Sequence, residues 1–185
     1  MKKQRLLPVQ AALLSVCGGL MLSTTVSAAE AGTITFNGKV TDETCQVTTG
    51  SSGDFTVDLA TAKVADLAQA GATAMPSNFR IAVNQCSPTV TNVRAQFLYD
   101  ANLVDVSSGV LKNQLSGDTS ATNVGLQLYN YADNSVIKPG DAGAAKSFTV
   151  QDGAAEMIYG VQYYATGKST AGLVKSQVKY QLSYN

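Results

Sequence analysis

The chain of 185 residues contains no histidine and no tryptophan, and only 14% of its residues are charged. Without histidine, Ser-His-Asp and Cys-His catalysis, imidazole acid-base chemistry and most zinc sites are excluded. The 13 basic and 13 acidic residues cancel, so the charge balance gives no indication of nucleic-acid binding. Carboxylate chemistry, ligand binding or a structural role remain, and we expect no metal and no other cofactor.

The first 28 residues have the three parts of a secretory signal peptide. A basic start is followed by an apolar run over residues 6–22 and by Val26-Ser27-Ala28, small residues of the kind that a signal peptidase recognises. We expect cleavage after Ala28, with cleavage after Ala29 as the alternative.

An apolar leader can also be retained as a membrane anchor, which needs about 20 continuous apolar residues. Here Pro8, Gln10 and the Gly18-Gly19 pair interrupt the run, so removal is favoured over retention. A lipoprotein site at Cys17 is favoured less still, because the bulky Val16 stands where such sites normally have a small residue.

Removal of the leader changes the charge and the cysteine count. It leaves 157 residues with 10 basic and 13 acidic side chains, a net charge of −3, and it leaves Cys45 and Cys86 as the only thiols. In an oxidising compartment such a pair is expected to form one disulfide. Closing a span of 41 residues would stabilise the fold by about 4 kcal/mol in the chain-entropy model. A redox role is disfavoured because the C-x-x-C spacing is missing.

Along the mature chain the dominant hydrophobic period is two, and turn residues recur about every ten positions. This pattern predicts a single all-β sandwich, with connecting stretches rich in Gly, Ser, Asn and Ala. Residues 62–70 predict one short helix that ends at Gly71. The expected strands cover residues 34–47, 54–59, 77–85, 92–99, 123–130, 148–150, 157–164 and 174–184.

Both ends of the mature chain are long alternating segments. At the C-terminus, alternation places six residues on one face: Val174, Ser176, Val178, Tyr180, Leu182 and Tyr184. Near the N-terminus, Ile34, Phe36, Gly38 and Val40 also share a face. A glycine inside a strand weakens it unless another group must approach closely, so Gly38 is interpreted as a shape-matching position.

These ends carry a resemblance to the major pilins of chaperone–usher pili, the type 1 fimbrial subunit family. The similarity spans the mature chain and includes the segment 32–40, Cys45, the segment 79–85 that ends before Cys86, the segments 121–128 and 163–167, the next-to-last Tyr184, and Gly172 fourteenth from the end. The resemblance implies a signal peptide over residues 1–28, an N-terminal extension over residues 29–44 and a pilin domain over residues 45–185.

The fold implied by this resemblance is an incomplete immunoglobulin-like β-sandwich that lacks its last strand and is completed by a strand from another subunit. The donor strand would be formed by Ile34, Phe36, Gly38 and Val40. The strand that accepts the chaperone first and the neighbouring subunit later would be formed by Gly172, Val174, Val178, Tyr180, Leu182 and Tyr184.

The function implied is that of a structural subunit of a bacterial surface fimbria, exported through the periplasm and supporting cell adhesion. The implied partners are identical subunits, a periplasmic chaperone and an outer-membrane usher, with a host glycan or receptor as a further candidate partner of the fibre. The resemblance implies no enzymatic activity.

Two other functional classes stay open. A minor adaptor or adhesive pilus subunit would share the same sequence features. A small periplasmic enzyme would have only carboxylates and tyrosines to use, and the adjacent Asp42 and Glu43 would point to opposite faces of a strand, which disfavours a glycosidase pair. A sugar-stacking surface would need aromatic side chains that more often serve as packing in strands: Tyr129, Tyr131, Tyr159, Tyr163 and Tyr164.

Overall fold

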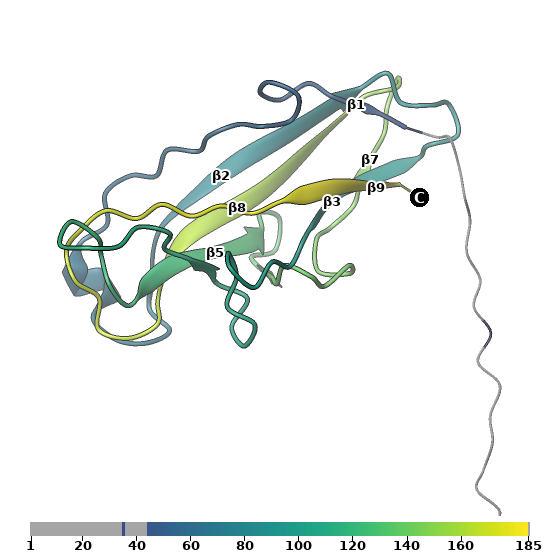
Figure 1. Cartoon of the computed structure of the whole chain (residues 1–185). Coiled ribbons are helices and arrows are strands. Elements are labelled where there is room, and N and C mark those ends of the chain that lie inside the picture. Colours follow the sequence, from purple (N-terminus) through teal and green to yellow (C-terminus); the bar gives the residue numbers. More distant parts are fainter. Residues whose placement is uncertain (1–34, 36–43, 185) are drawn as a thin grey trace, which may run out of the picture. The chain divides into compact units, whose positions relative to one another are not determined.

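The computed structural model describes Thr35 and residues 44–184, and residues 44–184 form two antiparallel β-sheets (Figure 1). The strands are β1 (Gln46–Val47), β2 (Thr73–Asn84), β3 (Asn92–Phe97), β4 (Leu111–Lys112), β5 (Val124–Asn130), β6 (Val136–Ile137), β7 (Phe148–Thr149), β8 (Ala155–Ala165) and β9 (Tyr180–Tyr184). One short 3-10 helix, η1 (Val64–Leu67), precedes β2. In the described part of the chain no helix is long and apolar enough to cross a membrane.

The larger sheet has the strand order β1-β2-β8-β5-β4, and β6 also pairs with β5. Its longest ladder joins β2 to β8, with a bulge between Ala74 and Ser77. The smaller sheet has the order β7-β3-β9. Among the described strands, β9 pairs with β3 alone, so its other edge faces away from the sheet and its backbone groups are available to an additional strand.

The main core lies between the inner faces of the two sheets. Ile81, Met157 and Tyr159 of the larger sheet pack in one cluster with Val93 and Ala95 of the smaller sheet, and all five side chains are fully buried. Along β3, fully buried positions alternate with half-buried ones, whereas β9 has half-buried side chains and a single exposed position, Gln181. The expected all-β sandwich is thus confirmed, because period-two side chains from both sheets meet in a shared interior.

Tyr159 of β8 connects the two sheets through its hydroxyl group. The phenol oxygen accepts a hydrogen bond from the Ala95 backbone N–H (2.9 Å) and donates one to the Lys146 carbonyl oxygen (3.1 Å). The ring also makes an edge contact with Phe97, with the ring centroids 5.3 Å apart. Burial raises the pKa of Tyr159 to about 12, since the phenolate would lose its hydration in this interior.

The largest differences from the predicted strands lie in two segments, and the short strands β4 and β6 were not predicted. Residues 55–59 and 174–179 were expected in strands, but neither segment forms a regular ladder with another described segment. The alternation itself is present in both segments, because every second side chain faces the core. Hydrophobic alternation predicts which way side chains face. A regular strand also needs a neighbouring strand with which its backbone can form a hydrogen-bonded ladder. The helix expected over residues 62–70 is the single turn η1.

Candidate functional site

The most incomplete part of the interior lies along the C-terminal segment, defined here as residues 172–184. Its inward-facing apolar side chains pack against the main core but remain half-buried: Val174, Val178, Tyr180, Leu182 and Tyr184. The alternate residues Lys175, Gln177, Lys179 and Gln181 are exposed. The inner face of this segment therefore carries no charged side chain, and its apolar surface is only partly covered.

Residues 55–59 form a second wall with the same property. Phe55, Val57 and Leu59 pack against the main core and are half-buried, while Thr56 and Asp58 are exposed. No backbone–backbone hydrogen bond joins residues 55–62 to any other residue that the structure describes. Both this wall and the C-terminal segment therefore present half-buried apolar side chains to the same core. We call this half-buried apolar surface, formed by residues 55–59 and the C-terminal segment, the groove.

An aromatic side chain forms the floor of the groove beside the second wall. Phe79 of β2 is half-buried, and its ring lies 6.1 Å from that of Phe55 and 6.0 Å from that of Tyr159, measured between ring centroids. A depression of about 350 Å³ is lined by Phe55, Val57 and Phe79, among others. Since large apolar side chains normally bury fully in a finished core, this arrangement has the chemistry of a site for an apolar strand.

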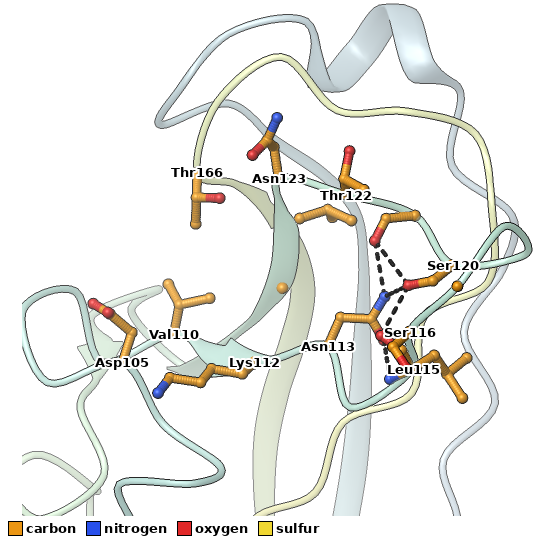
Figure 2. A pocket seen from close by; sticks show the side chains of 14 residues that line it. Asp105, Val110, Lys112, Asn113, Leu115, Ser116, Ser120, Thr122, Asn123 and Thr166 are labelled. Carbon is orange, nitrogen blue, oxygen red and sulfur yellow. Dashed lines mark hydrogen bonds between the residues drawn. The ribbon is translucent and has the colours of Figure 1, made fainter.

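One end of the groove is set by Gly172. A Cβ atom at this position would overlap the backbone of Ser120 and Ala121, so only glycine allows these two segments of the chain to lie so close together. Leu173 continues the contact: its carbonyl accepts from Ala121 N (3.0 Å) and its N–H donates to the Thr119 carbonyl (2.8 Å). Figure 2 shows the polar depression beside this contact, of about 470 Å³ and lined in part by Asn113.

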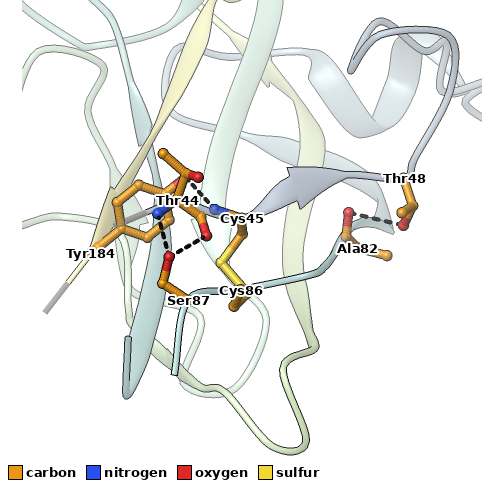
Figure 3. Close-up of a disulfide and its surroundings, with 7 residues drawn as sticks. All are labelled: Thr44, Cys45, Thr48, Ala82, Cys86, Ser87 and Tyr184. Atoms are coloured by element: carbon orange, nitrogen blue, oxygen red, sulfur yellow. Dashed lines mark hydrogen bonds between the residues drawn. A yellow bond between two sulfur atoms is a disulfide. The ribbon is translucent and has the colours of Figure 1, made fainter. Parts of the chain in front are cut away.

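The other end of the groove lies beside the disulfide. Cys45 and Cys86 are bonded, as predicted, across a sequence separation of 41 residues. The Cys45 backbone N–H donates to the Tyr184 hydroxyl (3.2 Å), as Figure 3 shows. The Tyr180 hydroxyl donates to the Gly53 carbonyl (2.8 Å). Two phenols of β9 therefore reach the N-terminal stretch of the domain and close this end of the groove.

Burial raises the pKa of Tyr180, and the carboxylate of Asp54 raises it further. The Tyr180 hydroxyl consequently stays protonated throughout the neutral range and remains a donor to Gly53. The inner face of the C-terminal segment is thus a neutral surface with a few hydroxyl groups, whereas Arg80 is among the residues that line the depression beside the second wall. Such a surface suits an uncharged, extended apolar segment better than an ionic ligand.

The structure brings most of the predicted acceptor residues together on the C-terminal segment, although only Tyr180, Leu182 and Tyr184 lie in the regular strand β9. The predicted donor residues Ile34, Phe36, Gly38 and Val40 lie outside the described residues, as do the signal peptide and the Asp42-Glu43 pair. The sequence pattern did not indicate that Phe55, Val57, Leu59 and Phe79 would be half-buried against the core in this way. The alternation over residues 54–59 was the available signal, but it was interpreted as an ordinary strand.

The five tyrosines considered as a sugar-stacking surface do not share one. Tyr159 is fully buried and Tyr129 is 5% exposed. Tyr163 packs against the core, whereas Tyr131 is 51% exposed. Within the described residues, no group of three or more His, Cys, Asp or Glu side chains could hold a metal ion.

Comparison with known proteins identifies the family. The profile described as "Fimbrial protein" matches residues 34–185. This chain belongs to the fimbrial protein family. The major fimbrial subunit SMF-1 of Stenotrophomonas maltophilia is 45% identical over 161 residues, which cover 83% of this chain and 92% of the relative. The F17 fimbrial protein of Escherichia coli is 41% identical over 169 residues, covering 88% of this chain and 92% of the relative.

Solved structures agree on the fold. A structure of a chaperone–usher pilus, described in connection with rod uncoiling, matches with a TM-score of 0.58 and 21% identity over 85% of this chain and 98% of that chain. The P pilus rod subunit PapA matches with a TM-score of 0.56 and 18% identity over 76% of this chain and 99% of that chain. The fold is that of a pilus subunit, the incomplete immunoglobulin-like sandwich that the family resemblance implied.

The family and the fold together define the role of this fimbrial protein. It is a structural subunit of a pilus shaft, and it is exported to the cell surface, where such subunits polymerise into fibres. The relatives named above are fimbrial subunits with structural roles. A minor adaptor, the alternative that the sequence left open, is not favoured by these comparisons.

Proposed function

We propose that this subunit polymerises by donor-strand exchange, in which residues 34–40 of one copy fill the groove of the next copy. One observation carries the proposal. Both walls of the groove present apolar side chains that face the core and stay half-buried, from Phe55, Val57 and Leu59 on one side and from the C-terminal segment on the other. A strand added between these walls would complete the interior.

The chemistry of the proposed donor matches that of the groove. Ile34, Phe36 and Val40 would each contribute about 1.5 to 3 kcal/mol by burying their side chains. The backbone of the donor would hydrogen-bond to the edge of β9, as in other cases of β-augmentation. Gly38 would lie where the groove is shallowest. Since each copy would donate one strand and accept one, a fibre of identical subunits follows.

The remaining parts of the proposal concern export and assembly. Residues 1–28 would direct export and then be removed, and residues 29–44 would serve as the donor extension. A periplasmic chaperone would cover the groove until an outer-membrane usher joins the subunits. The chain itself would have no enzymatic activity, and a host glycan or receptor would be bound only through the assembled fibre.

The substitution Gly38→Leu tests this proposal. A leucine side chain at the shallowest part of the groove should prevent docking, so we expect cells that express the variant to lose surface fibres in electron micrographs. Lys39→Leu is the matched control, because it adds the same side chain on the opposite face of the extension and should leave fibre formation intact. Fibres of normal number and length from Gly38→Leu would contradict the proposal.

A further inference from the structure

We propose that Asn113 is a positioning residue that fixes the register of the C-terminal segment and thereby determines which of its side chains face the groove. The inference rests on the proposed function in one respect only: the register is taken to present apolar side chains to a donor strand. The physical claim concerns the side-chain carboxamide of Asn113, which imitates a peptide group of a neighbouring strand.

The Asn113 carboxamide contacts the backbone on both sides of Val174. Its Nδ2 donates to the Leu173 carbonyl (3.0 Å), and its Oδ1 accepts from the Lys175 N–H (3.0 Å). In a parallel β-ladder, one residue donates to the carbonyl before its partner and accepts from the N–H after it. Asn113 makes the same pair of contacts from a side chain, with Val174 as the partner residue.

Further contacts of Asn113 hold its side chain in place. Nδ2 also lies within hydrogen-bond distance of the Ser120 hydroxyl oxygen (3.1 Å) and the Ala121 carbonyl (3.0 Å), so its two hydrogens are shared among three acceptors, and Oδ1 also accepts from the Leu115 N–H (3.2 Å). Figure 2 shows this cluster at the turn that follows Lys112. Only an amide side chain of this length supplies both a donor and an acceptor here, because an aspartate accepts only and an alanine does neither.

The register needs such a device because the middle of the C-terminal segment has few backbone partners. Beyond Lys175, whose carbonyl accepts from Gln114 N (2.7 Å), the next backbone–backbone bond runs from Leu98 N to the Lys179 carbonyl (2.8 Å). Gln177 and Val178 have no backbone–backbone bond to another described residue. A slip of one residue would turn Lys175 and Gln177 into the groove and Val178 out of it.

Thiol labelling measures the register directly. Single cysteines are introduced at Val178 and, separately, at Gln177 of the secreted subunit, and their rates of reaction with a maleimide are compared. In the wild-type background the cysteine at position 177 should react faster. We expect Asn113→Ala, and equally Asn113→Asp, to lower the ratio of the two rates by about tenfold, because the paired backbone contacts are lost.

Asn130→Ala is the matched control for a general loss of stability. Asn130 is fully buried, whereas Asn113 is half-buried, and its carboxamide is likewise hydrogen-bonded to the backbone, donating to the Ala144 carbonyl (2.8 Å) and accepting from the Lys146 N–H (2.8 Å), but it makes no hydrogen bond to the C-terminal segment. This control should leave the rate ratio unchanged. An unchanged ratio in Asn113→Ala, or an equal fall in Asn130→Ala, would overturn the inference. If Asn113→Ala does not fold, Asn113→Ser, which keeps one polar atom, replaces it with an expected change of about fivefold.

A second readout separates this inference from the proposed function. A fluorescent synthetic peptide of residues 32–41 is mixed with the wild type and each variant, and the rate of uptake is measured. We expect uptake by Asn113→Ala to be about tenfold slower than by the wild type, and uptake by Asn130→Ala to be unchanged. No uptake by the wild type would contradict the proposed function, while the labelling ratio would still test Asn113. Equal uptake by the wild type and Asn113→Ala would overturn the positioning role.

Discussion

Tyr159 reaches from β8 across the core to the smaller sheet, where its hydroxyl bonds the Ala95 N–H and the Lys146 carbonyl. The hydroxyl thus provides a hydrogen-bond partner for the buried Ala95 N–H and, at its other side, for the carbonyl of the exposed residue Lys146. The same reasoning applies to Gly172, where the lack of a side chain permits the contact with Ser120 and Ala121. At the scale of residues, the Tyr159 hydroxyl replaces a backbone hydrogen-bond partner, and the absence of a side chain at Gly172 leaves space for a backbone contact.

The substitution Tyr159→Phe removes only this hydroxyl. We expect it to lower the free energy of unfolding by about 1 to 3 kcal/mol, because a buried N–H and a carbonyl lose their partner. Urea unfolding of the secreted subunit measures the change. Tyr163→Phe is the control, since Tyr163 packs against the same core without such a bridge. Equal stability of the two variants would contradict the role of the Tyr159 hydroxyl.

The raised pKa of Tyr159 predicts a dependence of stability on alkaline pH. The folded-state pKa of about 12 lies above the ordinary tyrosine pKa of 10.0, so the folded state holds this proton more tightly than the unfolded state. The contribution is fully present below pH 10 and falls between pH 10 and about 12. The advantage of the wild type over Tyr159→Phe in urea unfolding should shrink across that range. A constant difference between the two proteins would refute this assignment.

At the scale of elements, the C-terminal segment combines two kinds of attachment. At its start, Asn113 hydrogen-bonds to the backbone and Gly172 packs closely against Ser120 and Ala121. At its end, β9 pairs with β3 from Phe97 to Val93. Its inner face lines the groove throughout. Because the outer edge of β9 is unpaired among the described strands, the element is both the last strand of the domain and a template for another one.

Deletion of residues 181–185 would remove all of β9 except Tyr180. We expect this truncation to abolish capture of the subunit by its periplasmic chaperone, because the edge that a borrowed strand would pair with is lost. Co-purification of the subunit with the chaperone from periplasmic extracts measures capture. Gln181→Ala, which changes an exposed side chain of β9, should be captured normally. A truncated subunit that still co-purified would count against the acceptor role of β9.

At the scale of the whole molecule, the domain has two well-formed sheets around a core that stays open along the groove. The disulfide joins the start of the domain to the end of β2, and the phenols of Tyr180 and Tyr184 attach β9 to the same region. The covalent link and these two phenol hydrogen bonds therefore lie at the same end of the groove. They attach β9 to the N-terminal part of the domain.

Replacement of both cysteines, Cys45→Ala with Cys86→Ala, tests the contribution of the covalent link. We expect the free energy of unfolding to fall by about 4 kcal/mol in the chain-entropy model for a loop of this length. Urea unfolding with and without a reductant measures it. The reductant should destabilise the wild type by a similar amount and leave the double variant unaffected. An unchanged midpoint in the double variant would exclude a stabilising role.

Several features could be predicted from residue types and spacing alone. The period of two predicted the all-β fold, and the pair of remaining thiols predicted the disulfide between Cys45 and Cys86. The alternation from Val174 to Tyr184 predicted correctly which side chains face inward. These features need no knowledge of distant contacts. Successive side chains of an extended chain alternate between two faces, and two thiols can form only one disulfide.

Other features depended on which distant segments meet. Residues 55–59 alternate like a strand but have no ladder partner among the residues that the structure describes, and Phe79 is half-buried beside them. Asn113 has no distinctive sequence context, yet it bonds Leu173 and Lys175, about 60 residues further along the chain. Hydrogen-bond partners and burial are set by long-range contacts, which composition and periodicity do not encode. The sequence by itself therefore determined which way the side chains of the alternating segments face. The half-buried groove and the contacts of Asn113 with the C-terminal segment were decided only by the tertiary structure, when distant segments packed together.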